Sequence, residues 1–162
     1  MRFTLEQRFT SPPDAVARAF ADPDLYVAFH GLPKMTAPEV LGHQIDGKKV
    51  VLRIRYRFDG ELSSAARAVL DPDRLTWVEH STHDLTARTT TFTMLPDHYA
   101  DRFRCTGTYR FQADGAGTVR RCQGEIRVKA LLVGGAVERA IVSGLEEHLA
   151  EEVPVVETFL SS

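Results

Sequence analysis

Alternation of apolar and polar residues over about 90 residues, beginning near position 38, constrains the fold more than any other feature of the sequence. In residues 50–58 the apolar side chains of Val50, Leu52, Ile54, Tyr56 and Phe58 alternate with three arginines. Residues 102–111 repeat this arrangement, with apolar side chains on one face and arginines on the other. Side chains two residues apart lie on the same face of a strand, so both segments predict strands with one buried face. The whole stretch therefore predicts an antiparallel meander.

The N-terminal segment predicts one strand followed by a pair of short helices. Residues 2–10 alternate as a half-buried strand does. The run Ser11-Pro12-Pro13-Asp14 predicts a helix through Phe20, with Ser11 as its N-cap and a proline in its first position. Asp22-Pro23-Asp24 predicts a second helix, which Gly31 ends.

Turn residues divide the meander into strands. Asp46-Gly47 and Asp59-Gly60 predict tight hairpin turns, and Asp71-Pro72-Asp73 predicts a looser turn. Residues 61–70 fit a short helix nearly as well as a strand, so the sheet is expected to have seven or eight strands. It also stays open which face of the strands within residues 61–95 turns inward.

A hairpin around residues 114–117 fixes a register that can be tested. It places Tyr109 opposite Cys122, Gly107 opposite Gly124 and Cys105 opposite Ile126. The two cysteines then share a face but lie beyond the reach of a disulfide. Two facing glycines indicate a bend or the close approach of another element.

Residues 131–160 predict one long helix. Its apolar stripe consists of Val133, Val137, Ile141, Leu145, His148 and Val156. This stripe needs the sheet as a partner. Gly144, on or near the buried face, lowers helix propensity unless it permits a close approach or leaves empty room.

Composition excludes several classes of protein. Apolar residues make up 43% and charged residues 26% of 162 residues, as in an ordinary globular domain. The net charge of −2 provides no general attraction to nucleic acid or to anionic membranes. Because no signal peptide and no spanning segment is evident, we expect a cytoplasmic protein without stable membrane insertion, folded as one domain over residues 1–162. The sequence makes no prediction about oligomers.

Several segments resemble a known superfamily. MRFTLEQRFTSPPDAVARAFADPD, LDPDRLTWVEHSTHDL, MLPDHYADRFRC and LVGGAVERAIVSGLEEHLAEEVPVVE resemble a branch of unknown function within the START-like, or SRPBCC, superfamily. The resemblance covers the whole chain and implies an α+β helix-grip fold, in which a curved antiparallel sheet grips a long C-terminal helix. It does not imply one activity, because that superfamily contains carriers, enzymes and regulators.

A ligand site is expected between the sheet and the long helix. We assign to it the inward aromatic and apolar side chains together with one histidine, namely Tyr56, Trp77, Phe92, Met94, Phe103, Tyr109, Ile141, Leu145 and His148. An apolar pocket with a few polar groups is the usual composition of a small-molecule site. The alternative is that these side chains simply fill a packed core.

Other polar residues have both functional and structural interpretations. His148 is either a polar contact for a ligand or a structural histidine. His98 and Tyr99 are expected in a loop at the rim of the sheet. His80 and His83 point to opposite faces of a strand, and this arrangement argues against metal binding. The arginines at 53, 55, 57, 102, 104, 110 and 120 are placed on an outer face that acids such as Glu61, Glu79 and Glu125 balance. We therefore predict no metal, no cofactor and no nucleic-acid partner.

Three functional hypotheses follow. The first is a binding protein for a hydrophobic or amphipathic small molecule such as a lipid, an isoprenoid or a polyketide-like compound. The second is an enzyme of the polyketide cyclase or dehydratase kind, with His148 or Tyr109 as acid or base. A protein-interaction domain with a filled core is the third.

Overall fold

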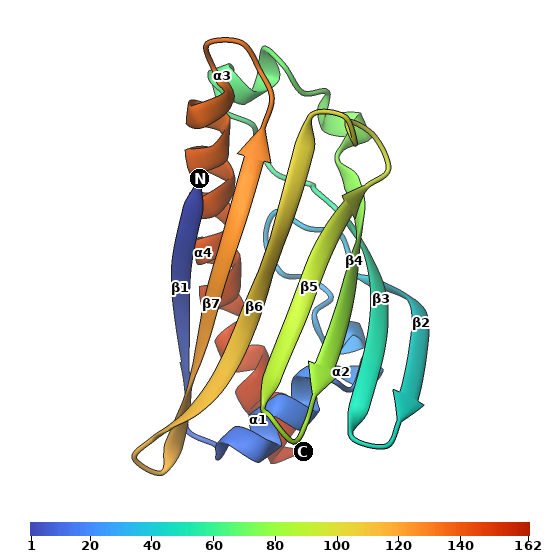
Figure 1. Cartoon of the computed structure of the whole chain (residues 1–162), viewed down its shortest axis with the longest axis vertical. Coiled ribbons are helices and arrows are strands. Elements are labelled where there is room, and N and C mark those ends of the chain that lie inside the picture. The colour runs from blue at the N-terminus through green and yellow to red at the C-terminus, as the bar shows by residue number, and fades with distance from the viewer.

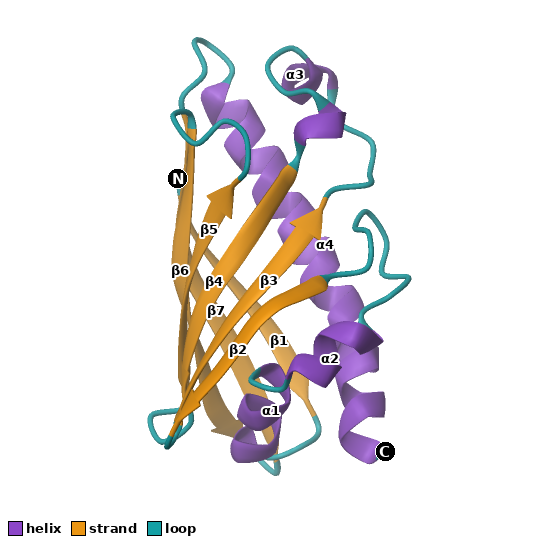
Figure 2. Ribbon diagram, turned by 90° about the vertical axis from the view of Figure 1, so that its right-hand side faces the viewer, coloured by secondary structure: helices purple, strands orange, loops and turns teal.

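Seven antiparallel strands form one curved sheet, and the helices lie on its concave side (Figure 1, Figure 2). The structure, a computed structural model, describes residues 1–162 except for the side chain of Ala65. The strand order is β1-β7-β6-β5-β4-β3-β2. The strands are β1 (Arg2–Phe9), β2 (Glu39–Asp46), β3 (Lys49–Arg57), β4 (Thr76–Asp84), β5 (Thr89–Pro96), β6 (Phe103–Asp114) and β7 (Gly117–Val128). The helices are α1 (Pro13–Phe20), α2 (Pro23–Ala28), α3 (Ser64–Arg67) and α4 (Gly134–Ser161).

The predicted alternation determines which face of the sheet is buried. In β3 the side chains of Leu52 and Ile54 are fully buried, whereas Arg53 and Arg55, which alternate with them, are exposed. Opposite solvation of the two faces fixes the register, because a slip by one residue would bury every arginine of the strand. The outer face is polar and mixed in charge, as the ion pair between Arg127 and Glu125 illustrates.

The register predicted for the β6–β7 hairpin is confirmed. Tyr109 pairs with Cys122, Gly107 with Gly124, and Cys105 with Ile126. A Cβ atom on Gly107 would lie 2.6 Å from the ring of Phe92, so this glycine makes room for a neighbouring aromatic side chain. Both cysteines are buried free thiols.

Helix α4 crosses the concave side of the sheet and packs on β1 and β7, while α1 and α2 cover one end and α3 lies near the other (Figure 2). It begins at Gly134, where a Cβ atom would come within 2.5 Å of the Val128 carbonyl oxygen. The prediction began this helix at residue 131, but Leu131 and Leu132 are 91% and 97% exposed and precede it. No helix in the described part of the chain is both long and apolar enough to cross a membrane.

The connection between β3 and β4 differs from the prediction of a tight hairpin at Asp59-Gly60. Residues 58–75 instead form a long excursion that contains α3 and the 3₁₀ turn Pro72–Arg74. The amide of Phe58 donates to Leu75, and that of Asp59 donates to Lys34, so partners far along the chain replace the hairpin. The helical alternative for residues 61–70 is therefore the right one, and the sheet has seven strands.

The two short helices start with different caps. Asp22 caps the predicted second helix, α2, because its carboxylate accepts a hydrogen bond from the amide of Asp24 at 2.9 Å. The prediction that Ser11 caps α1 was wrong, since the N-cap is Pro12 and no side chain caps it. The carbonyl of Ser11 accepts a hydrogen bond from Thr118 instead, which ties this turn to β7. Helix α2 ends at Ala28, and Gly31 lies in the turn beyond it with a φ of +82°.

Candidate functional site

The side chains proposed for the ligand site all belong to one region, the interior, which we define as the inner face of the sheet together with the facing side of α4. The six strand residues, Tyr56, Trp77, Phe92, Met94, Phe103 and Tyr109, lie on the inner face by register. Tyr56 pairs with Trp77, and their rings stack at a centroid distance of 5.7 Å. The rings of Phe92 and Tyr109 lie 5.1 Å apart.

The helical members of the set lie along the same side of α4. Ile141 and Leu145 pack against the core while remaining partly exposed. The side chain of His148 is 10% exposed. Val137 and Leu149, which are fully or almost fully buried, mark the centre of the face that α4 turns toward the sheet.

The two ends of the interior are packed differently. Near α1, the rings of Phe9, Phe20 and Phe111 are buried against one another, with centroids 5.9 Å apart in each of the two contacts. Toward α3, apolar residues on the inner face and on α4 remain partly exposed, namely Trp77, Met94, Phe103, Ile141 and Leu145. On the same helix, a Cβ atom at Gly144 would meet nothing within 4 Å. The α1 end is therefore filled, and the α3 end is packed less completely.

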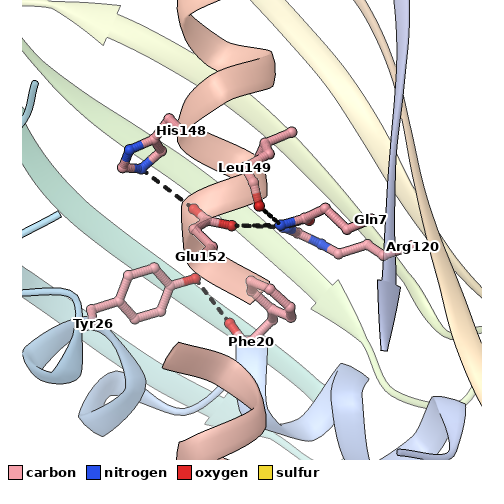
Figure 3. Close-up of polar contacts among 7 residues, drawn as sticks. All are labelled: Gln7, Phe20, Tyr26, Arg120, His148, Leu149 and Glu152. Carbon is pink, nitrogen blue, oxygen red and sulfur yellow. Dashed lines mark hydrogen bonds and ion pairs between the residues drawn. The ribbon is translucent and has the colours of Figure 1, made fainter. Parts of the chain in front are cut away.

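A buried ion pair connects the filled end with α4 (Figure 3). Arg120 lies 3.4 Å from a carboxylate oxygen of Glu152 and donates to the side-chain oxygen of Gln7. Gln7 in turn donates to Glu152 at 3.1 Å and to the Leu149 carbonyl at 2.6 Å. These contacts hold the Glu152 carboxylate in one position inside the protein.

The guanidinium of Arg120 also contacts two aromatic faces. Its central carbon lies 3.6 Å from the ring centroids of both Phe20 and Tyr109. Such stacking suits the planar, weakly hydrated guanidinium group and would suit a lysine less well. Our placement of Arg120 on the outer face was wrong. The predicted register implied the inward position, because Arg120 lies on the same face of β7 as Cys122, and Cys122 pairs with the inward-facing Tyr109.

His148 belongs to the same cluster. Its Nε2 lies 3.5 Å from the second carboxylate oxygen of Glu152, one helical turn away. Its Nδ1 is buried and has no hydrogen-bond partner among the described side chains. In the neutral imidazole, an Nε2–H directed at Glu152 leaves Nδ1 as an acceptor. The cluster therefore orients one nitrogen of His148 and leaves the other available.

Glu79 is a second acid of the interior, which the sequence analysis missed. It pairs with Ile54 on one side and Met94 on the other, and thus faces inward, not outward as predicted. Like Met94, it keeps some contact with water at the incompletely packed end. Loss of most of its hydration raises the pKa of Glu79 to about 7, and the nearby charge of Arg120 only partly offsets that rise. Trp77, two residues earlier, was assigned to the interior. Because side chains two residues apart in a strand lie on the same face, Glu79 could have been placed there as well.

The other histidines considered in the sequence lie on β4 and in a rim loop. His83 is buried and hydrogen-bonded to Ser81 and Thr90, while His80 on the opposite face is exposed, as expected. His98 and Tyr99 lie in a rim loop, where the Tyr99 hydroxyl accepts from the Asp71 amide. Among the residues whose side chains are described, no three acids, cysteines or histidines are placed to hold a metal ion.

Comparison with known proteins adds a family and a fold. A family model described as a protein of unknown function (DUF2505) matches residues 4–160. No curated protein sequence matches the chain significantly.

Solved structures with the same fold cover nearly the whole chain. TTHA0849 from Thermus thermophilus aligns with a TM-score of 0.70 at 18% identity, over 99% of this chain and 97% of that protein. The Zhui aromatase/cyclase from a Streptomyces species gives 0.64 at 16% identity, with 99% and 93% covered. Norcoclaurine synthase from Thalictrum flavum gives 0.65 at 16% identity, with 100% and 87% covered. These likenesses confirm the helix-grip fold.

Proposed function

The chain belongs to the DUF2505 family, and we propose that it binds a hydrophobic or amphipathic small molecule between the sheet and α4. The site takes in the nine residues assigned from the sequence and the acid Glu79. Its apolar wall comes from the strands, and its polar groups come from β4 and α4.

The incomplete packing near α3 is the observation that carries this proposal. Protein interiors are normally packed as densely as organic crystals, so inward apolar side chains lose nearly all contact with water. Trp77, Met94 and Leu145 face the interior, yet their side chains remain partly exposed to water. A ligand that covers this apolar surface gains about 25 cal/mol of binding free energy for each Å² removed from water.

The fold neighbours support a small-molecule site by analogy. Two of them are named as enzymes, an aromatase/cyclase and a norcoclaurine synthase. At 16% identity the resemblance concerns the fold, and the same fold hosts different functions on different side chains. Only the interior residues of this chain can therefore indicate its own function.

A fluorescent probe tests the proposal with a matched pair of variants. N-phenylnaphthylamine is uncharged and emits strongly in apolar surroundings, so its emission should rise when the protein is added and fall when lipids or aromatic compounds compete. Met94→Trp places a larger side chain on the inner face, whereas Leu95→Trp places it on the outer face, where Leu95 is 50% exposed.

We expect Met94→Trp to weaken probe binding at least about tenfold and Leu95→Trp to leave it unchanged. Thermal unfolding of each variant checks that it is folded. Failure of the wild-type protein to enhance the probe, or equal binding by Met94→Trp, would contradict the proposal.

Proton transfer is a second candidate function, favoured by one observation. His148 has one nitrogen directed at a fixed carboxylate and the other unpartnered among the described side chains, an arrangement typical of a general base. Acetonaphthone, an apolar methyl ketone, provides a test in heavy water, because abstraction of a methyl proton and its replacement by deuterium erases the methyl signal in proton NMR. Acceleration by the wild type and its loss in His148→Gln would favour this function, and exchange at the uncatalysed rate would exclude it.

A further inference from the structure

Glu79 is the acid of the interior whose carboxyl group has no partner among the described side chains. The other acid of the interior, Glu152, has Arg120 and Gln7. For Glu79, desolvation and the charge of Glu152 raise the pKa, the charge of Arg120 lowers it, and no hydrogen bond to a described side chain contributes. A poorly solvated acid without a partner is costly unless a proton or a ligand satisfies it.

The titratable and charged groups around Glu79 come from two helices and three strands of the interior. Those that carry or can carry a charge are Arg120 and Cys122 on β7, Glu152 on α4, Tyr26 on α2, Tyr56 on β3, and Cys105 and Tyr109 on β6, and His148 lies beyond Glu152 on α4. Arg120 is the one fixed cation among these described residues, and it is already engaged by Glu152. Glu79 therefore shares its nearest cation with a competing acid.

Three other buried nitrogen atoms of the interior lack partners as well, and one of them is the Nε of Arg120, whose Nη1 contacts Gln7 and Glu152. The indole Nε1 of Trp77 and the Nδ1 of His148 are buried, and neither has a hydrogen-bond partner among the described side chains. Trp77 lies two residues from Glu79 on the same face of β4, so the two side chains are neighbours. The ring of His148 extends from α4 on the side of the ion-pair cluster away from β1 (Figure 3).

We propose that Glu79, Trp77 and His148 form the polar end of the ligand site, and that the ligand is an uncharged molecule with an apolar body and a hydroxyl or carbonyl oxygen. This assignment rests on the function proposed above and specifies its ligand. The oxygen accepts hydrogen bonds from the indole N–H and from the protonated carboxyl group of Glu79. A hydroxyl group can in addition donate to His148.

The hydrogen-bond donors and acceptors of Glu79, Trp77 and His148 favour an uncharged oxygen on the ligand over a charged group. A ligand carboxylate would bring a further negative charge toward the carboxylate of Glu152, whose charge already raises the pKa of Glu79, and like charges at short range repel strongly. A ligand ammonium group has only donors, so it would leave the Trp77 indole N–H unpaired. A neutral oxygen avoids both penalties.

The proposal predicts that affinity depends on pH. Glu79 donates to the ligand only when it is protonated, and its pKa is about 7 in the free protein. Binding should therefore be strongest below about pH 7 and weaken by up to about tenfold for each further pH unit. An ammonium ligand would show the opposite dependence, because it needs the ionised carboxylate.

A series of naphthalenes substituted at the same ring position tests the ligand chemistry. The compounds are naphthalenemethanol, acetonaphthone, naphthoate, naphthylmethylamine and methylnaphthalene, titrated calorimetrically at about pH 6 and about pH 8. At the lower pH, the alcohol and the ketone should bind at least about tenfold more tightly than the other three. Tighter binding of the acid or the amine, or equal binding of methylnaphthalene, would overturn the assignment.

Substitutions at Glu79 separate this assignment from the function on which it rests. Glu79→Gln keeps a neutral donor at every pH, so it should retain the affinity for the alcohol and remove its pH dependence. Glu79→Leu should narrow the advantage of the alcohol over methylnaphthalene, because only Trp77 and His148 then remain to bind the oxygen. Glu125→Gln, on the outer face with a side chain that is 43% exposed, is the matched control and should behave as the wild type does.

The outcomes are distinguishable. If methylnaphthalene binds but the oxygen compounds have no advantage, the polar-end assignment fails and the binding function stands. If no compound of the series binds at any pH, the binding function fails as well. A pH dependence that persists in Glu79→Gln but disappears in His148→Gln would assign the titration to His148 and overturn the role given to Glu79.

Discussion

His148 and Glu152 face each other one turn apart on α4, with Nε2 of the imidazole 3.5 Å from a carboxylate oxygen. The other oxygen of the same carboxylate contacts Arg120 and Gln7, which belong to β7 and β1. The pair therefore connects the filled end of the interior with the incompletely packed end. A substitution that breaks the ion pair between Arg120 and Glu152 should therefore also change the position of His148.

The buried ion pair should contribute far more to stability than its exposed neighbour. Arg120→Met leaves Glu152 buried without its cation, which typically costs about 3–5 kcal/mol. Arg121→Met removes an exposed pair with Glu6, worth about 1 kcal/mol or less. Urea denaturation of both variants gives the two free energies of unfolding. Losses of equal size would show that burial does not control this interaction.

His83 should make the protein less stable in acid. Burial lowers the pKa of His83 to about 3, well below the value of about 6.5 for an unfolded chain. Between these values the unfolded state binds a proton that the native state does not, so stability falls as pH falls through this range, by up to about 1.4 kcal/mol per unit. His83→Gln should flatten this slope between pH values of about 7 and 5 in urea denaturation. The exposed His80→Gln is its control, and an unchanged slope in His83→Gln would contradict the account.

Glu79 should have the opposite effect on the pH dependence. Its pKa is raised to about 7, so the native state binds more protons than the unfolded state between about pH 4.5 and 7. The stability it contributes is present below that window and is lost as pH rises through it. Glu79→Gln should therefore stabilise the ligand-free protein at about pH 8 by up to about 3 kcal/mol, and do little at about pH 4. Destabilisation at the higher pH would mean that the carboxylate has a partner.

Two glycines of the interior should respond to alanine in opposite directions. At Gly144 a Cβ atom meets nothing within 4 Å, so Gly144→Ala should gain helix propensity, about 1 kcal/mol. At Gly107 the same atom would lie 2.6 Å from the Phe92 ring, so Gly107→Ala should lose about 1–3 kcal/mol through overpacking. Thermal and urea unfolding provide the check. A loss of stability in Gly144→Ala would indicate that the space beside the helix is filled.

Local patterns in the sequence predicted most of the fold. Alternation in β3 and β6 identified the strands and their buried faces, because period two leaves only one way to bury Leu52 and Tyr109. The turn at residues 114–117 fixed the register of the last hairpin correctly. The excursion between β3 and β4 could not be predicted in this way, because contacts of Phe58 and Asp59 with distant residues decide it.

The polar part of the site escaped prediction for a different reason. Arg120 and Glu79 are charged, and charged residues are almost never fully buried unless they are paired, so both were assigned to the outer face. In the structure Arg120 is paired across three elements, with partners at positions 7 and 152. Such a partnership is tertiary and leaves no local signal. Both residues lie two positions from an inward-facing residue of the same strand, and this alternation predicted their orientation better than their charge did.

The chain has three methionines, and they allow the central claim to be measured directly. Met94 lies on the inner face of the incompletely packed end, whereas Met1 precedes β1 at the edge of the sheet. Protein labelled with carbon-13 at its methionine methyl groups can be titrated with naphthalenemethanol and followed by NMR. The account predicts that the Met94 methyl signal shifts to saturation and shows nuclear Overhauser contacts to the naphthalene ring, while the Met1 signal stays in place. A Met94 signal that does not move at saturating ligand would contradict binding between the sheet and α4.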